Sequence, residues 1–219
     1  MKRVVVKLCG VTEERDALEA AHLGVDVLGF HFTEGAPRYV DPELARRIVE
    51  RLPVFQATVG VFVDDPIIRV LEVAQRVGLT AVQRGGREAP SLCRALAPLP
   101  WYKAFSLHAG FDPEALSQYP CTTFLLDTSL QGPDGSPAAF DWRKIRTLGL
   151  YGRILIGGDL DPTNVALAVE QARPYGVDVL TGVEVAPGKK DLDRVERFVE
   201  AVRRAERRME AETKGGAGG

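Results

Sequence analysis

Two side chains that can carry protons stand at the ends of apolar runs, far apart in the sequence. Cys9 ends the run 4–9, and Asp127 ends the run 123–127. A carboxyl group at the end of an apolar strand is costly to bury and is usually hydrogen-bonded or functional. A thiol and a carboxyl group that flank one substrate can serve as the base and the acid of an isomerisation. Each also has a simpler interpretation, because a cysteine can pack as a small apolar side chain and an aspartate can cap a loop.

The neighbours of Cys9 bear on its reactivity. Side chains alternate along a strand, so Lys7 and Cys9 share one face. An ammonium group near a thiol lowers its pKa and raises the thiolate fraction, which predicts a reactive Cys9. If Asp178 on a neighbouring strand neutralises Lys7, that effect shrinks and Lys7 contributes mainly to stability.

These residues need a fold that brings them together, and the order of the apolar runs predicts one. Runs typical of β-strands alternate with amphipathic helical stretches along nearly the whole chain. The expected strands are 4–9, 25–32, 56–63, 80–83, 101–106, 123–127, 153–156 and 177–180, and the expected helices are 13–23, 41–52, 66–77, 88–97, 112–118, 141–149, 162–173 and 191–208. Eight alternations indicate an α/β fold and favour a closed (β/α)8 TIM barrel over an open sheet.

A short repeat supports this topology. The sequence GVDVL at 24–28 recurs at 176–180, and 78–82 is a looser copy. Each begins with a glycine just after an expected helix, where a left-handed residue is favoured, and then enters a strand. No linker rich in Pro or Ser interrupts the pattern. We therefore expect one barrel domain over residues 1–209 and a disordered tail over 210–219.

In such a barrel, catalytic groups lie at the C-terminal ends of the strands and in the loops that follow. Cys9 and Asp127 both meet this condition, and their strands lie nearly opposite each other across the barrel mouth. The loops after the last two strands contain the pair 157–158 (GG) and the run 181–184 (TGVE). Small residues let backbone N–H groups approach an anion, and this fold commonly binds phosphate in these two loops.

The composition argues against several classes of protein. The 219 residues are 45% hydrophobic and 26% charged, which is typical of a soluble globular protein. A net charge of -2 supplies no field for nucleic acid, and no apolar run is long enough for a membrane span. Cys9, Cys93 and Cys121 are widely spaced, which argues against a disulfide framework or a structural zinc site and favours a reducing cytoplasm.

Taken in order, the motifs resemble those of the phosphoribosylanthranilate isomerase family. The matching segments are 7–12 (KLCGVT), 32–38 (FTEGAPR), 59–63 (VGVFV), 125–127 (LLD), 140–142 (FDW), 157–158 (GG), 162–165 (PTNV), 178–184 (DVLTGVE) and 187–191 (PGKKD). The resemblance extends over roughly residues 4–200. One motif would be weak, but this many in one order is specific.

The resemblance implies an Amadori rearrangement in tryptophan biosynthesis, with neither a metal nor an organic cofactor. N-(5-phosphoribosyl)anthranilate would become 1-(2-carboxyphenylamino)-1-deoxyribulose 5-phosphate. Asp127 would be the general acid that opens the furanose ring, and Cys9, as a thiolate, the general base at C2′. Arg38 would bind the anthranilate carboxylate, a task suited to a planar guanidinium. The other implied substrate-binding residues are Gly157, Gly158, Asp178, Thr181, Gly182 and Val183.

The sequence departs from the family after Gln83. The family usually has Leu-His-Gly there, whereas this chain has Arg-Gly-Gly at 84–86, so any help from the histidine is absent or comes from Arg84 or Arg87. Two other functions stay open. One is the Amadori isomerase of histidine biosynthesis, which would have Asp in place of Cys9, and the other is a phosphate-binding barrel without activity. We expect a small phosphorylated substrate as the partner, and a monomer or homodimer.

Overall fold

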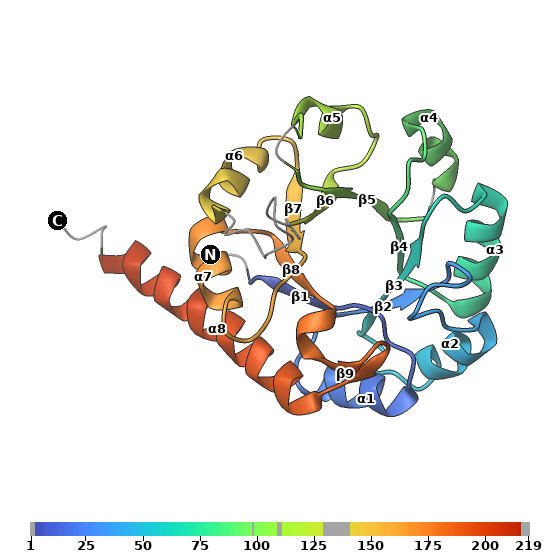
Figure 1. Cartoon of the computed structure of the whole chain (residues 1–219), viewed down its shortest axis with the longest axis horizontal. Coiled ribbons are helices and arrows are strands. Elements are labelled where there is room, and N and C mark those ends of the chain that lie inside the picture. The colour runs from blue at the N-terminus through green and yellow to red at the C-terminus, as the bar shows by residue number, and fades with distance from the viewer. Residues whose placement is uncertain (1–2, 98, 109–110, 129–140, 216–219) are drawn as a thin grey trace, which may run out of the picture.

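The computed structural model describes residues 3–97, 99–108, 111–128 and 141–215, and these residues form a closed barrel of parallel strands (Figure 1). Each strand pairs with the next one in the chain, and β8 pairs with β1 to close the ring. The strands are β1 (Val5–Leu8), β2 (Val27–His31), β3 (Ala57–Phe62), β4 (Ala81–Arg84), β5 (Trp101–Ser106), β6 (Thr123–Asp127), β7 (Arg153–Gly157) and β8 (Gly176–Val179). The (β/α)8 barrel predicted from the sequence is therefore confirmed.

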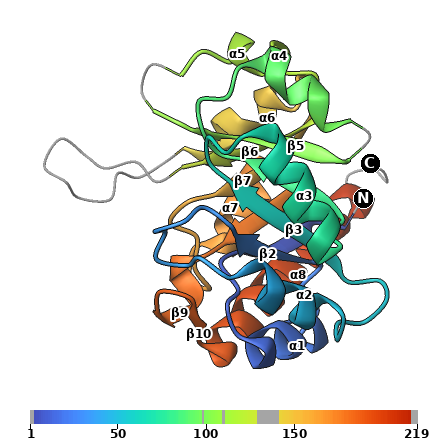
Figure 2. The same ribbon diagram turned by 90° about the vertical axis from the view of Figure 1, so that its right-hand side faces the viewer.

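Helices connect the strands and surround the barrel (Figures 1 and 2). They are α1 (Glu14–His22), α2 (Pro42–Val49), α3 (Ile67–Val77), α4 (Pro90–Cys93), α5 (Glu114–Ser117), α6 (Ile145–Leu148), α7 (Val165–Ala172) and α8 (Leu192–Gly215). Short 3-10 segments are η1 (Arg94–Leu96), η2 (Trp142–Lys144) and η3 (Thr181–Val183), and β9 (Glu184–Ala186) pairs with β10 (Lys189–Lys190) as a small hairpin. α4 and α6 are shorter than expected because η1 and η2 take up part of the predicted helical stretches.

Local signals explain several helix ends. The side chain of Asp41 caps α2 by accepting two backbone N–H groups of its first turn. α3 ends at Gly78, whose φ is 77°, as the repeat predicted. The later copy of the repeat differs, because Arg173 takes the left-handed conformation after α7. Gly176 is instead the first residue of β8, where a Cβ would come within 2.8 Å of the carbonyl oxygen of Val5.

The apolar side chains form two cores. Inside the barrel, Val59, Tyr102, Leu125 and Leu155 pack together. A larger core fills the layer between the strands and the surrounding helices. The barrel interior also holds a buried ion pair, Lys7 with Asp178. Charges in such a place are stable only when they are paired, so this pair is part of the architecture as well as of the site.

The C-terminal helix is longer than predicted. α8 runs to Gly215, so the expectation of a disordered tail is wrong for residues 210–215. The residues Glu210, Ala211 and Glu212 are strong helix formers and extend a helix that already packs on the barrel. Figure 1 shows α8 reaching beyond the barrel. Residues 216–219 of the predicted tail lie outside the described residues.

Candidate active site

The thiol of Cys9 lies at the mouth of the barrel. Cys9 directly follows β1, and its N–H donates to the carbonyl oxygen of Val179 on β8 at 2.9 Å. The residue is only 3% exposed. Gly10 follows with a φ of 70°, and a Cβ there would overlap the side chains of Leu180 and Arg38. The missing side chain at Gly10 therefore lets Arg38 lie beside Cys9.

Lys7 and Asp178 form a buried ion pair next to Cys9. The register of β1 and β8 sets the two residues side by side, and Lys7 Nζ lies 2.7 Å from Asp178 Oδ1. Burial by itself would lower the pKa of Lys7, but the carboxylate of Asp178 holds that pKa well above its usual value. The sequence-based alternative, in which Asp178 neutralises Lys7, is confirmed.

The predicted lowering of the Cys9 pKa is wrong. Burial raises the pKa of the Cys9 thiol and outweighs the opposite effect of Lys7, while the charge of Asp178 raises it further. Desolvation dominates because the thiolate would have to form away from water, and the nearest ammonium is already paired. Cys9 is therefore a thiol at neutral pH.

A histidine on the neighbouring strand contacts the thiol. Nε2 of His31, the last residue of β2, lies 3.2 Å from Sγ of Cys9. Burial, followed by the charge of Lys7, lowers the pKa of His31 to about 4. The imidazole is thus neutral at pH 7, and one of its nitrogens is free of a proton.

Glu184, the first residue of β9, joins three groups around Cys9. Its carboxylate accepts hydrogen bonds from Arg38 Nη2 at 2.7 Å, from Lys190 Nζ at 2.8 Å and from the N–H of Gly188 at 3.1 Å. Lys190 Nζ also donates to the carbonyl oxygen of Cys9 at 2.5 Å. Although burial would raise the pKa of Glu184, the bonds from Arg38 and Lys190 hold it below its usual value. The hairpin β9–β10 is thereby fastened to the residue predicted to be the base.

Asp127 ends β6 at the same end of the barrel as Cys9. In the ring of strands, β7 and β8 lie between β6 and β1. The carbonyl oxygen of Asp127 accepts from the N–H of Leu107 at 2.7 Å. The next residue, Thr128, donates from Oγ1 to the carbonyl oxygen of Gly157 at 2.7 Å. These bonds fix the backbone that carries the carboxyl group.

The two glycine loops are in direct contact. Gly157 ends β7, and Gly158 follows with a φ of 108°, a conformation that other residues rarely adopt. Gly182 lies between Thr181 and Val183 in η3, where a Cβ would overlap the carbonyl oxygen of Leu160. The absence of a side chain at Gly182 therefore lets the loops after β7 and β8 pack closely, beside the end of β6.

The structure decides against Arg84 as a replacement for the family histidine. Side chains alternate along β4, and Gln83 faces the barrel interior, where its Oε1 accepts from the hydroxyl of Tyr102 at 2.9 Å. Arg84 lies on the other face, where Nη2 donates to the carbonyl oxygen of Asp65 at 2.8 Å and lies 3.1 Å from Glu88 Oε1. Its guanidinium is thus directed away from Cys9.

Sequence reasoning found Cys9, Lys7 and Asp178 as neighbours but missed the contacts of His31 and Glu184. A signal for His31 existed, because it shares a face with Gly29 on the strand next to Cys9. Glu184 belongs to a motif used for the family resemblance, yet nothing in its spacing indicates a bond to Arg38.

Among the described residues, no group of three or more His, Cys, Asp or Glu side chains is arranged to hold a metal ion. In the same part of the chain, no helix is both long enough and apolar enough to cross a membrane.

Comparison with known proteins identifies the family. The family model described as N-(5'phosphoribosyl)anthranilate (PRA) isomerase matches residues 6–201. The N-(5'-phosphoribosyl)anthranilate isomerase of Geobacter sp. (strain M21) is 44% identical over 195 residues, which cover 89% of this chain and 95% of that protein. The crystal structure of the Thermotoga maritima isomerase superposes with a TM-score of 0.84 at 40% identity, over 91% of this chain and 98% of that one. A crystal structure of a phosphoribosyl anthranilate isomerase in complex with reduced 1-(o-carboxyphenylamino)-1-deoxyribulose 5-phosphate gives 0.83 at 39% identity, with the same coverage. The chain therefore belongs to the N-(5'-phosphoribosyl)anthranilate isomerase family.

Proposed function

We propose that this chain isomerises N-(5-phosphoribosyl)anthranilate to 1-(2-carboxyphenylamino)-1-deoxyribulose 5-phosphate, a step of tryptophan biosynthesis, without a cofactor. The observation that carries the proposal is that Cys9, directly after β1, and Asp127, at the end of β6, lie at the same mouth of the barrel, beside the paired glycine loops. The structure of a relative bound to the reduced product supports the same substrate class, a small phosphorylated molecule.

In this proposal Asp127 and Cys9 divide the proton transfers. Asp127 gives its proton to the furanose ring oxygen, the bond between that oxygen and C1′ breaks, and a protonated Schiff base forms. Cys9 takes the proton from C2′ in its thiolate form, after its own proton has left, and the electron pair of the C2′–H bond forms the double bond of an enolamine. The enolamine then gains a proton at C1′ and loses one from the 2′-hydroxyl, which gives the ketone.

Arg38 is the group we assign to the anthranilate carboxylate. Its stem passes over Gly10, directly after Cys9, and Glu184 binds the Nε and Nη2 side of its guanidinium. The carboxylate of the substrate would bind at Nη1 of the Arg38 guanidinium, while Glu184 holds that guanidinium in the required orientation. The ring carboxylate and the proton taken by Cys9 would thus be held close together.

The phosphate is assigned to backbone N–H groups of the two glycine loops. Gly157 and Gly158 would contribute from the loop after β7, and Thr181, Gly182 and Val183 from η3. The contact of Gly182 with Leu160 supports this assignment because it brings both loops to one place. A direct role of Asp178 in binding substrate stays a prediction, since its carboxylate is engaged with Lys7.

Turnover of freshly prepared phosphoribosylanthranilate, followed by the loss of its fluorescence, tests the proposal. We expect turnover by the wild-type protein and nearly none by Cys9→Ser, because a hydroxyl is hardly ever ionised near pH 7. A protein that binds a product analogue but turns nothing over would be a phosphate-binding barrel. Turnover of the histidine-pathway substrate alone would favour the other Amadori isomerase.

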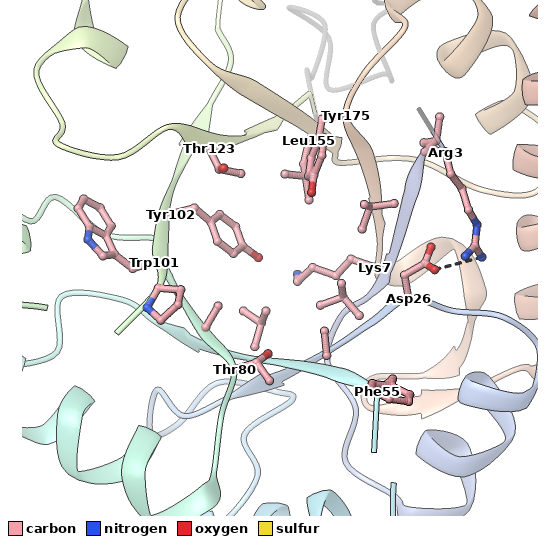
Figure 3. Close-up of a pocket in the computed structure, with 17 residues that line it drawn as sticks. Arg3, Lys7, Asp26, Phe55, Thr80, Trp101, Tyr102, Thr123, Leu155 and Tyr175 are labelled. Carbon is pink, nitrogen blue, oxygen red and sulfur yellow. Dashed lines mark ion pairs between the residues drawn. The ribbon is translucent and has the colours of Figure 1, made fainter. Parts of the chain in front are cut away.

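We propose that the macromolecular partner is a second copy of the chain. A relative from Thermotoga maritima is described as dimeric. At the barrel end opposite Cys9, a cavity of about 550 Å³ opens between the N-terminal ends of the strands, with Trp101 and Tyr102 on one side (Figure 3). Phe55 lines this cavity and is 100% exposed, and its neighbour Val54 is 93% exposed. Exposed apolar side chains next to a cavity suit a two-fold interface, in which Phe55 of each copy would enter the cavity of the other copy.

Mass measurement by light scattering tests the dimer. We expect a dimer for the wild type and a monomer for Phe55→Asp, because the interface would bury a charge. Ile68→Asp is the matched control. Ile68 is also exposed, but it is the second residue of α3 and lies at the other end of the barrel. A monomeric wild-type protein, or an equal effect of both substitutions, would contradict this interface.

We also propose a cytoplasmic location and a single barrel domain over residues 1–209. The unpaired state of Cys9, Cys93 and Cys121 supports a reducing compartment.

A further inference from the structure

We propose that His31 accepts the proton of the Cys9 thiol, so that the base of the isomerisation is a cysteine–histidine pair. This inference rests on the proposed function and adds to it a positioning residue that acts through Cys9. The observation behind it is the 3.2 Å contact between His31 Nε2 and Cys9 Sγ, at the distance of a hydrogen bond to sulfur.

The backbone is arranged to permit this contact. β1 and β2 are paired in parallel with Leu8 opposite Leu28, so Cys9 lies beside Gly29, and His31 lies one step further along the same face. A Cβ on Gly29 would lie 3.1 Å from Cys9 Sγ and 3.2 Å from Lys7 Cε. The missing side chain at Gly29 thus leaves the space in which the sulfur reaches across to β2.

The charges around the pair leave both partners neutral at rest. The surrounding titratable groups are Lys7 on β1, Asp178 on β8, Arg38 after β2, Tyr102 on β5 and Lys190 on β10. Glu184 forms ion pairs with both Arg38 and Lys190. Burial keeps the pKa of Cys9 raised, and burial with the nearby cations holds the pKa of His31 at about 4. A neutral thiol therefore faces a neutral imidazole, whose Nε2 can accept when the ring proton is on Nδ1.

The proton balance is complete. The S–H bond of Cys9 breaks as its proton forms a bond to Nε2 of His31, and the sulfur electron pair takes the proton of C2′. The C2′–H electron pair becomes the enolamine double bond, which leaves Cys9 as a thiol and His31 as an imidazolium. The imidazolium then releases one proton to solvent while Asp127 regains one, so the protein is unchanged over the cycle.

The first test uses thiol chemistry and needs no turnover. Iodoacetamide labelling of each cysteine is measured against pH by mass spectrometry, with Cys93 and Cys121 as internal references. In His31→Gln, which keeps the size of the side chain but not its basicity, we expect Cys9 to react about tenfold more slowly at neutral pH and its profile to move to higher pH. Identical Cys9 profiles in both proteins would overturn the pairing.

The second test follows turnover of phosphoribosylanthranilate. We expect kcat of His31→Gln to fall by about 10²-fold near pH 7 with KM nearly unchanged, and the rising limb of kcat/KM to move to higher pH. In His31→Ala, added imidazole should restore part of the rate. The matched control is His22→Gln on the exposed face of α1, which should leave both the rate and the profile unchanged.

The outcomes separate this inference from the proposed function. A fall in kcat without a change in the pH profile and without rescue would assign His31 a packing role and overturn the relay. If the wild type turned over no phosphoribosylanthranilate, the proposed function would fail, and the labelling profiles would still decide whether His31 and Cys9 act as a pair.

Discussion

At the scale of single residues, replacing Asp127 by Asn changes the chemistry of the side chain with little change in its shape. Asn has the same outline but cannot give up a proton to the ring oxygen. We expect Asp127→Asn to fold normally, to bind a product analogue, and to lose about 10²–10⁴-fold in kcat. Steady-state kinetics measures kcat, and titration with the product analogue measures its binding. Asp112→Asn, an exposed carboxylate before α5, is the control, and wild-type turnover in Asp127→Asn would remove the residue from the mechanism.

Lys7 is expected to matter more for stability than for the reactivity of Cys9. Because Lys7 is paired with Asp178 inside the barrel, Lys7→Met leaves a buried carboxylate without its partner. We expect the free energy of unfolding to fall by about 3–5 kcal/mol, and the double variant Lys7→Met/Asp178→Leu to regain most of it. The pKa of Lys7 is raised, so its stabilising contribution is complete below the unfolded value of 10.5 and is lost as the pH rises through the folded value. Urea unfolding of the three proteins measures this, and a Lys7→Met protein of wild-type stability would contradict it.

His31 makes the fold sensitive to acid. Its pKa falls from 6.5 to about 4 on folding, so the unfolded state binds more protons between these values. The stabilising contribution is present above pH 6.5 and is lost as the pH falls toward 4, by on the order of 3 kcal/mol. Urea unfolding between pH 7 and pH 4 should show a steeper loss in the wild type than in His31→Gln. Parallel curves would mean that His31 is not buried in its neutral form.

The hairpin β9–β10 is the element that holds Arg38 in place. Glu184 bonds to both Arg38 and Lys190, and Lys190 reaches the backbone of Cys9. We expect Arg38→Ala to weaken substrate binding by about ten- to a hundredfold, the value of a charge-assisted hydrogen bond of about 1.5–3 kcal/mol. Glu184→Gln should raise KM more than it lowers kcat, because Arg38 remains but is less well oriented. Product analogues with and without the ring carboxylate provide the measurement, and an equal loss for both in Arg38→Ala would count against the carboxylate clamp.

The helices and strands could be predicted from the sequence where a single regular pattern of apolar residues determines them. The strands 101–106 and 123–127 match β5 and β6, because apolar runs bounded by turns are strong local signals. The run 25–32 extends past β2 at both ends, since the apolar pattern continues into the loops beyond the hydrogen-bonded ladder. The C-terminal helix was underestimated because helix propensity, rather than an apolar pattern, extends its last turns.

The part of the site that could be predicted is the part whose position is set by the ends of the strands. Cys9 follows the last residue of β1 and Asp127 ends β6, and because all strands of the barrel are parallel, the topology alone places both at the same mouth. The Cys9–His31 contact depends on how far two side chains reach between strands, and the bond of Arg38 to Glu184 joins loops that are 146 positions apart. The pKa of Cys9 could not be predicted for a further reason, because it depends on whether burial outweighs a cation that is already paired.

For the whole molecule, α8 ties the end of the chain to its beginning. Arg203 donates to the carbonyl oxygen of Val4 at 2.7 Å and to Asp26 Oδ2 at 2.9 Å. Glu206 accepts a hydrogen bond from the N–H of Val4, so the backbone just before β1 is satisfied by the last helix. Met209 is buried at 1% exposure, whereas Glu210, the residue after it, is exposed. The packed part of the molecule therefore ends close to residue 209.

Two truncations test this boundary. A chain that ends at Met209 keeps all of these contacts, and we expect its free energy of unfolding to stay within about 1 kcal/mol of the full chain. A chain that ends at Val202 loses Arg203, Glu206 and Met209, which leaves the N–H of Val4 unpaired and an apolar site unfilled. These losses cost about 1–3 and 2–5 kcal/mol in comparable cases, so we expect a fall of at least about 3 kcal/mol. Urea unfolding compares the three proteins. If the chain ending at Met209 lost as much as the shorter one, the helical residues 210–215 would be part of the domain, and if neither lost stability, α8 would not be what closes this end of the barrel.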